Sequence, residues 1–195
     1  SLTSVTIPNS VTTIGNSAFS GCDGLTSVTI PDSVTSIGNS AFSDCTELTE
    51  IYYNAVEVSD FSSSSNIFYN AGSSGKGITV IFGNTVKSIP AFLFYNGTYI
   101  INVTIGNSVT RIGYDAFSNC TALTSIIIPN SVTSIEAWAF SFSGLTSATF
   151  ENPYGWWCAY SDTATSGENI RELHNSSTAA TYLKLTYNIH YWKRS

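Results

Sequence analysis

A repeating unit of 23 residues runs through most of this chain. Residues 2–24 read LTSVTIPNSVTTIGNSAFSGCDG and residues 25–47 read LTSVTIPDSVTSIGNSAFSDCTE, so nearly every position is identical. The same pattern returns at Ile100 and at Leu123. A period of roughly 20 to 50 residues is typical of repeat proteins, in which one unit is too small to bury its own apolar face and its neighbours must cover it. The sequence therefore predicts a solenoid of stacked coils over residues 1–150.

The array contains seven strand starts and one insertion. The strand starts are Leu2, Leu25, Leu48, Gly77, Ile100, Leu123 and Leu145. The step from Leu48 to Gly77 is 29 residues, longer than the period, and the surplus falls in the Ser- and Gly-rich stretch 58–77. The middle of this stretch is apolar and contains Phe61, Ile67, Phe68 and Tyr69. We favour packing of the insertion against the array over an open binding loop.

Each unit has the same inward-facing pattern. Leu2, Val5 and Ile7 have the spacing of a short strand that buries one edge, and Pro8 ends the strand because proline has no N–H for a ladder. We expect a single helical turn to follow and to point Phe19 inward. The equivalent residues in the regular units are predicted to stack as an aromatic spine: Phe19, Phe42, Phe94, Phe117 and Phe140. The strands of successive units are expected to be parallel.

The repeated unit resembles the BspA-like class of bacterial leucine-rich repeats over residues 2 to 150. The inward Leu, Val and Ile, the Pro-Asn-Ser-Val turn, the Ile-Gly, the Ala-Phe and the Cys all fall in register. The resemblance implies an α/β horseshoe-like leucine-rich-repeat solenoid, and a secreted or cell-surface protein used for adhesion or ligand capture. It supplies no catalytic or cofactor residues. The chain lacks Met and begins within its own pattern, so we expect an internal or C-terminal piece of a longer polypeptide.

Residues 151–195 abandon the period and hold three of the four Trp residues. The end of a solenoid exposes a cross-section of its core, so terminal segments usually act as caps. The residues expected to cover the last coil are Trp156, Trp157, Tyr182, Leu183, Leu185 and Trp192. An aromatic platform for sugar rings remains the alternative for these side chains.

The cysteines are predicted to be packing residues. Cys22, Cys45 and Cys120 occupy the same slot of their units, and Cys158 lies alone in the cap. In adjacent coils the two side chains point the same way, which separates their Cβ atoms by more than the roughly 3.8 Å usual in a disulfide. We therefore expect free thiols. No Cys-x-x-Cys or Cys/His pair has ligand spacing, so no metal site is expected.

Charge and motifs exclude several function classes. Seven basic residues against thirteen acidic ones are scattered along the chain, which disfavours nucleic-acid binding. No apolar run approaches the ~18 residues of a membrane span. No phosphate loop, nucleophile elbow or zinc motif occurs, so we expect no enzyme and no cofactor. A Ser/His/acid set would have to be assembled in the cap from His174 or His190 with Asp162, Glu168 or Glu172.

The outward face of the strands is the candidate binding surface. One outward column reads Thr6, Thr29, Tyr52, Ile81, Thr104, Ile127 and Thr149. Its three large members and their polar neighbours make an apolar patch in a field of hydroxyl groups, which is typical of interaction sites. The ligand-binding candidates are Tyr52, Ile81, Ile127, Thr104, Glu50 and Asn102. The alternative is that these residues are merely good strand formers that cover one another.

The sequence leaves two function classes open. The first, which we favour, is a non-catalytic binding or adhesion module of an exported bacterial surface protein that contacts a protein or glycan through the strand face. The second is a passive structural spacer that presents another domain of the parent chain. We expect a monomer in either case.

Overall fold

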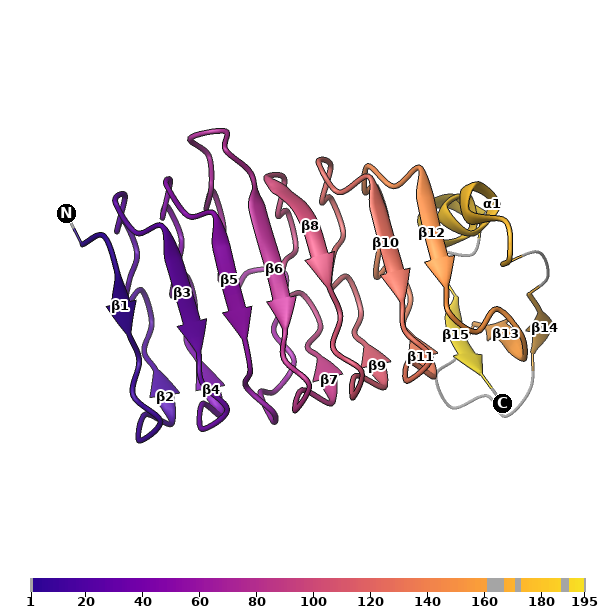
Figure 1. Ribbon diagram of the computed structural model, residues 1–195, viewed down its shortest axis with the longest axis horizontal. Helices are drawn as coiled ribbons and strands as arrows, with labels where there is room; N and C mark the ends of the chain where they lie inside the picture. Colours follow the sequence, from indigo (N-terminus) through magenta and orange to yellow (C-terminus); the bar gives the residue numbers. More distant parts are fainter. Residues whose placement is uncertain (1, 161–166, 171–172, 187–189, 195) are drawn as a thin grey trace.

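The computed structural model describes residues 2–160, 167–170, 173–186 and 190–194. Seven parallel strands stand side by side in one layer, one for each predicted strand start (Figure 1). They are β1 (Val5–Thr6), β3 (Ser27–Ile30), β5 (Glu50–Tyr53), β6 (Ile78–Phe82), β8 (Ile100–Thr104), β10 (Ser125–Ile128) and β12 (Ser147–Phe150). The first five form one sheet, and β10 pairs with β12 in another. The predicted leucine-rich-repeat solenoid of parallel strands is confirmed.

A second row is formed by short strands that come after the first-row strands of their coils in the chain. Its members are β2 (Thr13–Ile14), β4 (Ser36–Ile37), β7 (Ser88–Ile89), β9 (Arg111–Ile112) and β11 (Ser134–Ile135). The pairs β2–β4, β7–β9 and β9–β11 are parallel. Residues 54–77, all of which are described, contribute no strand to this row, so the insertion interrupts it between β4 and β7.

The third side of each coil is built from turns, and the expected helical turn is wrong. Within residues 2–160 there is no helix. Ser17 has φ +54°, outside the helical region. The N–H groups of Ser17 and Phe19 donate to carbonyl groups of the next coil, while that of Ala18 donates back to Gly15. A helix would direct all these donors along its own chain, whereas here every second donor binds the neighbouring coil.

The aromatic spine is confirmed and is longer than predicted. The Phe19 and Phe42 rings stack with centroids 5.2 Å apart, as do those of Phe117 and Phe140 at 5.3 Å. Phe68, which lies in the insertion, fills the remaining place: its ring is 5.2 Å from Phe42 and 5.0 Å from Phe94. The spine is therefore continuous through the irregular coil.

The insertion packs on the array, as we favoured. Ile67 and Phe68 are buried in the core, Phe61 packs against it and Tyr69 is exposed. An ion pair also holds the insertion, because the Arg111 guanidinium donates to both carboxylate oxygens of Asp60 at 3.0 and 2.8 Å. Arg111 pairs with Glu136 as well, at 2.5 Å. Burial alone would raise the pKa of Asp60, but the hydrogen bonds from Arg111 and the Ala91 N–H outweigh it and lower that pKa.

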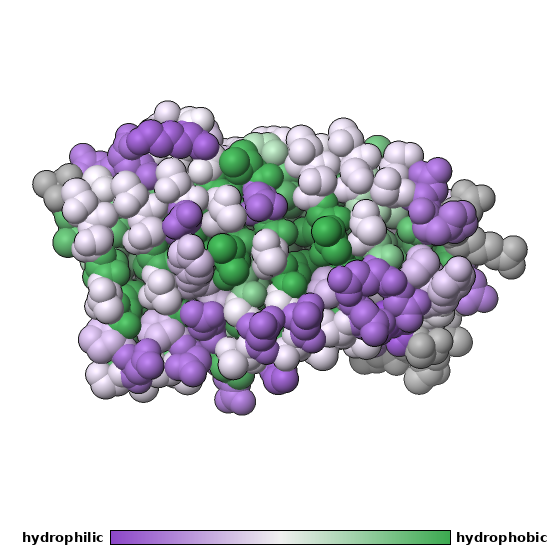
Figure 2. All heavy atoms as spheres, in the orientation of Figure 1, coloured by the Kyte–Doolittle hydropathy of each residue, from purple (hydrophilic) through white to green (hydrophobic). Residues whose placement is uncertain are grey.

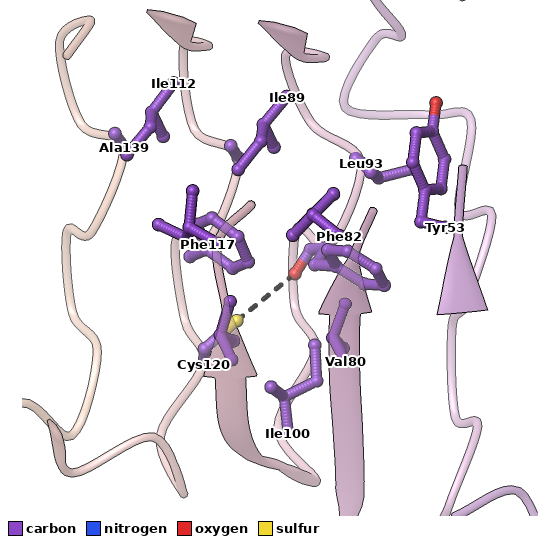
Figure 3. Close-up of a cluster of buried hydrophobic side chains, with 14 of the residues drawn as sticks. Tyr53, Val80, Phe82, Ile89, Leu93, Ile100, Ile112, Phe117, Cys120 and Ala139 are labelled. Atoms are coloured by element: carbon purple, nitrogen blue, oxygen red, sulfur yellow. Dashed lines mark hydrogen bonds between the residues drawn. The ribbon is translucent and has the colours of Figure 1, made fainter. Parts of the chain in front are cut away.

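The cysteines are free thiols, as predicted. Cys45 and Cys120 are fully buried, and their sulfur atoms lie 3.2 and 3.4 Å from the carbonyl oxygens of Phe19 and Phe94. Figure 3 shows Cys120 among core side chains, with its bond to the neighbouring coil dashed. Burial and the nearby Cys22 raise the pKa of the Cys45 thiol to about 12, so it stays protonated at neutral pH.

The C-terminal segment covers the last coil (Figure 1). It contains β13 (Trp156–Ala159), β14 (Glu168–Asn169), α1 (Ser176–Thr181), a π-helix (Tyr182–Thr186) and β15 (Tyr191–Arg194). The β15 strand pairs antiparallel with β11, which joins the cap to the second row. Trp156 and Trp192 are buried, with ring centroids 5.2 and 6.1 Å from that of Phe150.

The other cap predictions hold only in part. Leu183 is buried as expected, while Trp157 and Tyr182 are half-buried. The prediction for Leu185 is wrong, because 60% of this residue is exposed. No repeat constrains this segment, so its register on the last coil was not available from the sequence.

Removing a ring from the spine should strongly destabilise the array. Phe117 contacts the rings of Phe94, Phe140 and Phe82 and is fully buried. We expect Phe117→Ala to lower the free energy of unfolding by about 3 to 5 kcal/mol, measured by urea denaturation. The exposed Tyr69 is the matched control, and Tyr69→Ala should cost less than about 1 kcal/mol. If the two variants lost equal free energy of unfolding, the stacked rings would not be a main source of the array's stability.

The Asp60 ion pair should make stability depend on pH. The folded-state pKa of Asp60 is lowered, so its contribution is present above the ordinary aspartate pKa and is lost as pH falls through the folded-state value. We expect Asp60→Asn to lower the melting temperature at pH 7 by about 2 to 4 °C. The difference from the wild type should shrink in acid. Asp32→Asn, at an exposed turn position, should change the melting temperature at neither pH. A difference that persists at pH 2 would contradict this explanation.

Candidate functional site

The predicted outward column exists as a physical row across the strands. Strand pairing sets Thr29 opposite Tyr52, Tyr52 opposite Ile81, and Ile81 opposite Thr104. Ile127 lies opposite Thr149 in the second sheet. Figure 2 shows apolar side chains gathered along the middle of this face, with hydrophilic side chains along its lower edge and towards the two ends of its upper edge.

The members of this row differ in accessibility. Ile127 is 59% exposed and Tyr52 is 36% exposed, whereas Ile81 is only half-buried between its neighbours. The Tyr52 hydroxyl donates to the Glu50 carboxylate at 3.4 Å, a long bond at an exposed site. Tyr52, Ile81 and Glu50 therefore form one patch over β5 and β6.

The remaining candidates meet in a groove between β8 and β10. Asn102, Thr104 and Ile127 line it, and its volume is about 330 Å³. The groove lies where the ladder is broken, because β8 and β10 belong to different sheets. The β8 strand also carries one extra residue at this point: Ile78 pairs with Ile100 but Thr79 pairs with Asn102.

The charge around this surface is acidic. Glu50 lies at one end of the patch, and Glu151 lines the far wall of the groove, where its carboxylate accepts from the Asn130 N–H at 2.9 Å. The groove wall also includes Asn107 and Pro129. Apolar contact combined with hydroxyl and amide hydrogen bonds is what this surface offers to a ligand.

Of the hypothetical Ser/His/acid set, the structure describes His174, His190 and Glu168. His174 is exposed on the surface, and the His190 ring is buried against Tyr160 with centroids 4.1 Å apart. Burial lowers the pKa of His190, with the Glu168 charge acting in the opposite direction. Asp162 and Glu172 lie outside the described residues. Among the residues that are described, no three His, Cys, Asp or Glu side chains converge as metal ligands would.

The sugar platform considered for the cap is not formed by its two central tryptophans. Trp156 and Trp192 are fully buried, so their faces are occupied by the core. The structure instead reveals a cluster that the sequence analysis missed, on the turn side of the later coils. Its members are Phe92, Tyr95, Tyr114, Trp138 and Phe142. The signal was present in the sequence, because the first two units carry Asn, Ser, Gly or Asp at the corresponding positions.

Comparison with known proteins gives a consistent result. A sequence profile described as "BspA type Leucine rich repeat region (6 copies)" matches residues 1–73 and 62–178. No protein of curated function matches the chain significantly. None of the described helices is long and apolar enough to cross a bilayer.

Solved structures of bacterial leucine-rich repeat proteins are similar to this chain. A leucine-rich repeat protein from Eubacterium ventriosum is 30% identical with a TM-score of 0.61, covering 83% of this chain and 40% of its own length. One from Bacteroides ovatus is 33% identical with a TM-score of 0.59, covering 74% of this chain and 36% of its own. The chain thus spans about two fifths of these relatives. The repeat register, the solenoid and the profile agree, and the chain belongs to the BspA-type leucine-rich repeat family.

Proposed function

We propose that this chain is a non-catalytic binding module of an exported bacterial surface protein, and that it contacts a protein or glycan through the strand face. The observation that carries the proposal is the strongly exposed Ile127 beside a groove, next to the Tyr52 patch. Exposed apolar side chains rimmed by polar groups are typical of interaction sites. Family membership supports an interaction or surface module. It also supports the non-catalytic part of the proposal, because leucine-rich repeats are generally non-catalytic.

Export and surface display belong to the same proposal. The two structures described above are of bacterial leucine-rich repeat proteins, and surface display is what the BspA-like resemblance implies. A formal charge of −6 with scattered basic residues supports a partner other than nucleic acid.

A passive spacer is the second candidate. It is favoured because residues of the patch partly bury one another. Ile81 is half-buried, and the Tyr52 hydroxyl already donates a hydrogen bond to Glu50 of the same strand. In a spacer, these residues would serve only strand formation and cross-strand packing.

Substitution of the two most exposed apolar members of the row separates these candidates. We expect Tyr52→Ser with Ile127→Ser to weaken binding at least tenfold, because both side chains offer accessible apolar area at the centre of the face. Binding is measured by biolayer interferometry against extracellular-matrix proteins, mucins and a defined glycan set. Melting temperature should change by only a few degrees, since neither side chain belongs to the core.

The matched control is Thr6→Ser with Thr29→Ser, which alters the same column in the first two coils. It should bind like the wild type. A ligand held equally well by all three proteins would place binding outside the strand face, and the absence of any ligand across the screen would favour the spacer.

A further inference from the structure

The aromatic ledge is a chain of rings on the turn side of the later coils, made of Phe92, Tyr95, Tyr114, Trp138 and Phe142. The Phe92 ring lies 5.7 Å from Tyr95 and 5.4 Å from Tyr114, and the Tyr114 ring lies 5.2 Å from Trp138. Trp138 is 39% exposed and Phe142 is 68% exposed. These rings do not belong to the buried spine, so the core does not account for them.

A hollow of about 380 Å³ opens at the ledge. Tyr95, Trp138 and Phe142 line it together with polar groups, chiefly Asp115 and Asn119. The remaining lining residues are Ser118 and Ser141. Asp115 is only 7% exposed, and burial raises the pKa of its carboxyl despite an opposing hydrogen bond with Ser118. Aromatic walls around a few fixed polar groups are the usual composition of a small-ligand pocket.

Three of the five ledge residues occupy backbone positions that disfavour large side chains. Phe92, Trp138 and Phe142 have φ of +57°, +58° and +54°. The left-handed region is uncommon for any residue but Gly and is best tolerated by Asn and Asp. The same two positions in other coils are held by small or short polar residues: Ser17, Ser40, Asn66 and Asp115 at the first, and Gly21, Asp44, Asn70, Asn96 and Asn119 at the second. Folding alone explains those small residues but not the aromatic ones, and strain of this kind collects at functional sites.

We propose that the aromatic ledge is a second binding site, separate from the strand face, and that it takes a neutral oligosaccharide whose pyranose rings lie on Trp138 and Phe142. The C–H face of a sugar ring packs on an aromatic face, and its hydroxyl groups donate to carboxylate and amide oxygens such as those of Asp115 and Asn119. A neutral glycan is favoured over an anionic one, since the lining residues include a carboxylate and no Lys or Arg. An anionic glycan would find a like charge there and no cation to pair with.

Replacing Trp138 and Phe142, two of the three strained rings, by the residues of other coils tests the proposal. Trp138→Ser copies Ser40, and Phe142→Asn copies Asn119, each at the same left-handed position. The double variant is compared with the wild type by native affinity electrophoresis in gels containing galactomannan, mixed-linkage β-glucan, xylan or, as the anionic contrast, heparin. We expect retardation by at least one neutral polysaccharide, weakened at least tenfold in the variant.

Stability distinguishes binding from packing. Relief of backbone strain should leave the melting temperature of the double variant unchanged or raise it by about 2 to 4 °C. Two controls should retain binding: Tyr69→Ser, which removes an exposed ring outside the ledge, and the strand-face variant Tyr52→Ser with Ile127→Ser. The latter control keeps this test independent of the function proposed for the strand face.

Four outcomes would overturn the proposal. They are the absence of retardation by every neutral polysaccharide, equal retardation of the wild type and the double variant, retardation by heparin alone, and a melting temperature of the double variant clearly below that of the wild type. The last would mean that the rings serve packing. Protection of the wild type, but not the variant, from acrylamide quenching in the presence of the retarding polysaccharide would support contact at Trp138, because Trp156 and Trp192 are buried and the half-buried Trp157 is present in both proteins.

Discussion

The contact between successive coils is the interaction on which the structure depends. A large part of each coil's hydrogen bonding is with its neighbours, because its strand pairs with the next strand and every second turn N–H donates to the next coil. The stacked phenyl rings add apolar burial along the same axis. Because stability in such an array is roughly a sum of nearest-neighbour terms, an irregular coil is tolerated only if it keeps these columns aligned. The third coil does so by returning Phe68 to the spine.

The same constraint explains the insertion and the cap. Asn70 donates to Asp44 across 26 residues, and Asn119 donates to Asn96 across 23, so the extra residues are accommodated without loss of the turn column. At the other end the last coil has no following repeat, and buried Trp156 and Trp192 supply the apolar cover. The antiparallel β15 strand then uses the edge of β11 that a further coil would otherwise occupy.

The periodicity of the sequence predicts the features that every unit repeats. It does not predict features that depend on contacts between units or on segments outside the repeat. The seven strands, the spine and the cysteine column were predictable, because an inward residue recurs at the same position in every regular unit. The turn of Ser17 was mistaken for a helix because its N–H partners lie in another coil. The place of Phe68 in the aromatic spine was not predicted, because the insertion alters the spacing of its unit. The exposure of Leu185 was not predicted, because its segment has no repeat. The groove between β8 and β10 depends on a lost ladder, which no single unit encodes.

Because packing fixes the inward residues of each unit, only the outward residues can differ freely between units. The strand face and the turn side differ in what their outward residues indicate about binding. On a strand, Tyr52 and Ile127 are residues that a β-conformation favours anyway, so their presence fits either binding or strand formation. On the turn side the backbone opposes the side chain, since Trp138 and Phe142 stand where Ser, Asn, Asp and Gly are found in other coils. Folding alone explains the presence of a residue that suits its local backbone conformation. A residue that strains the backbone needs another explanation, such as binding. The turn side is therefore where the sequence departs most clearly from what folding requires.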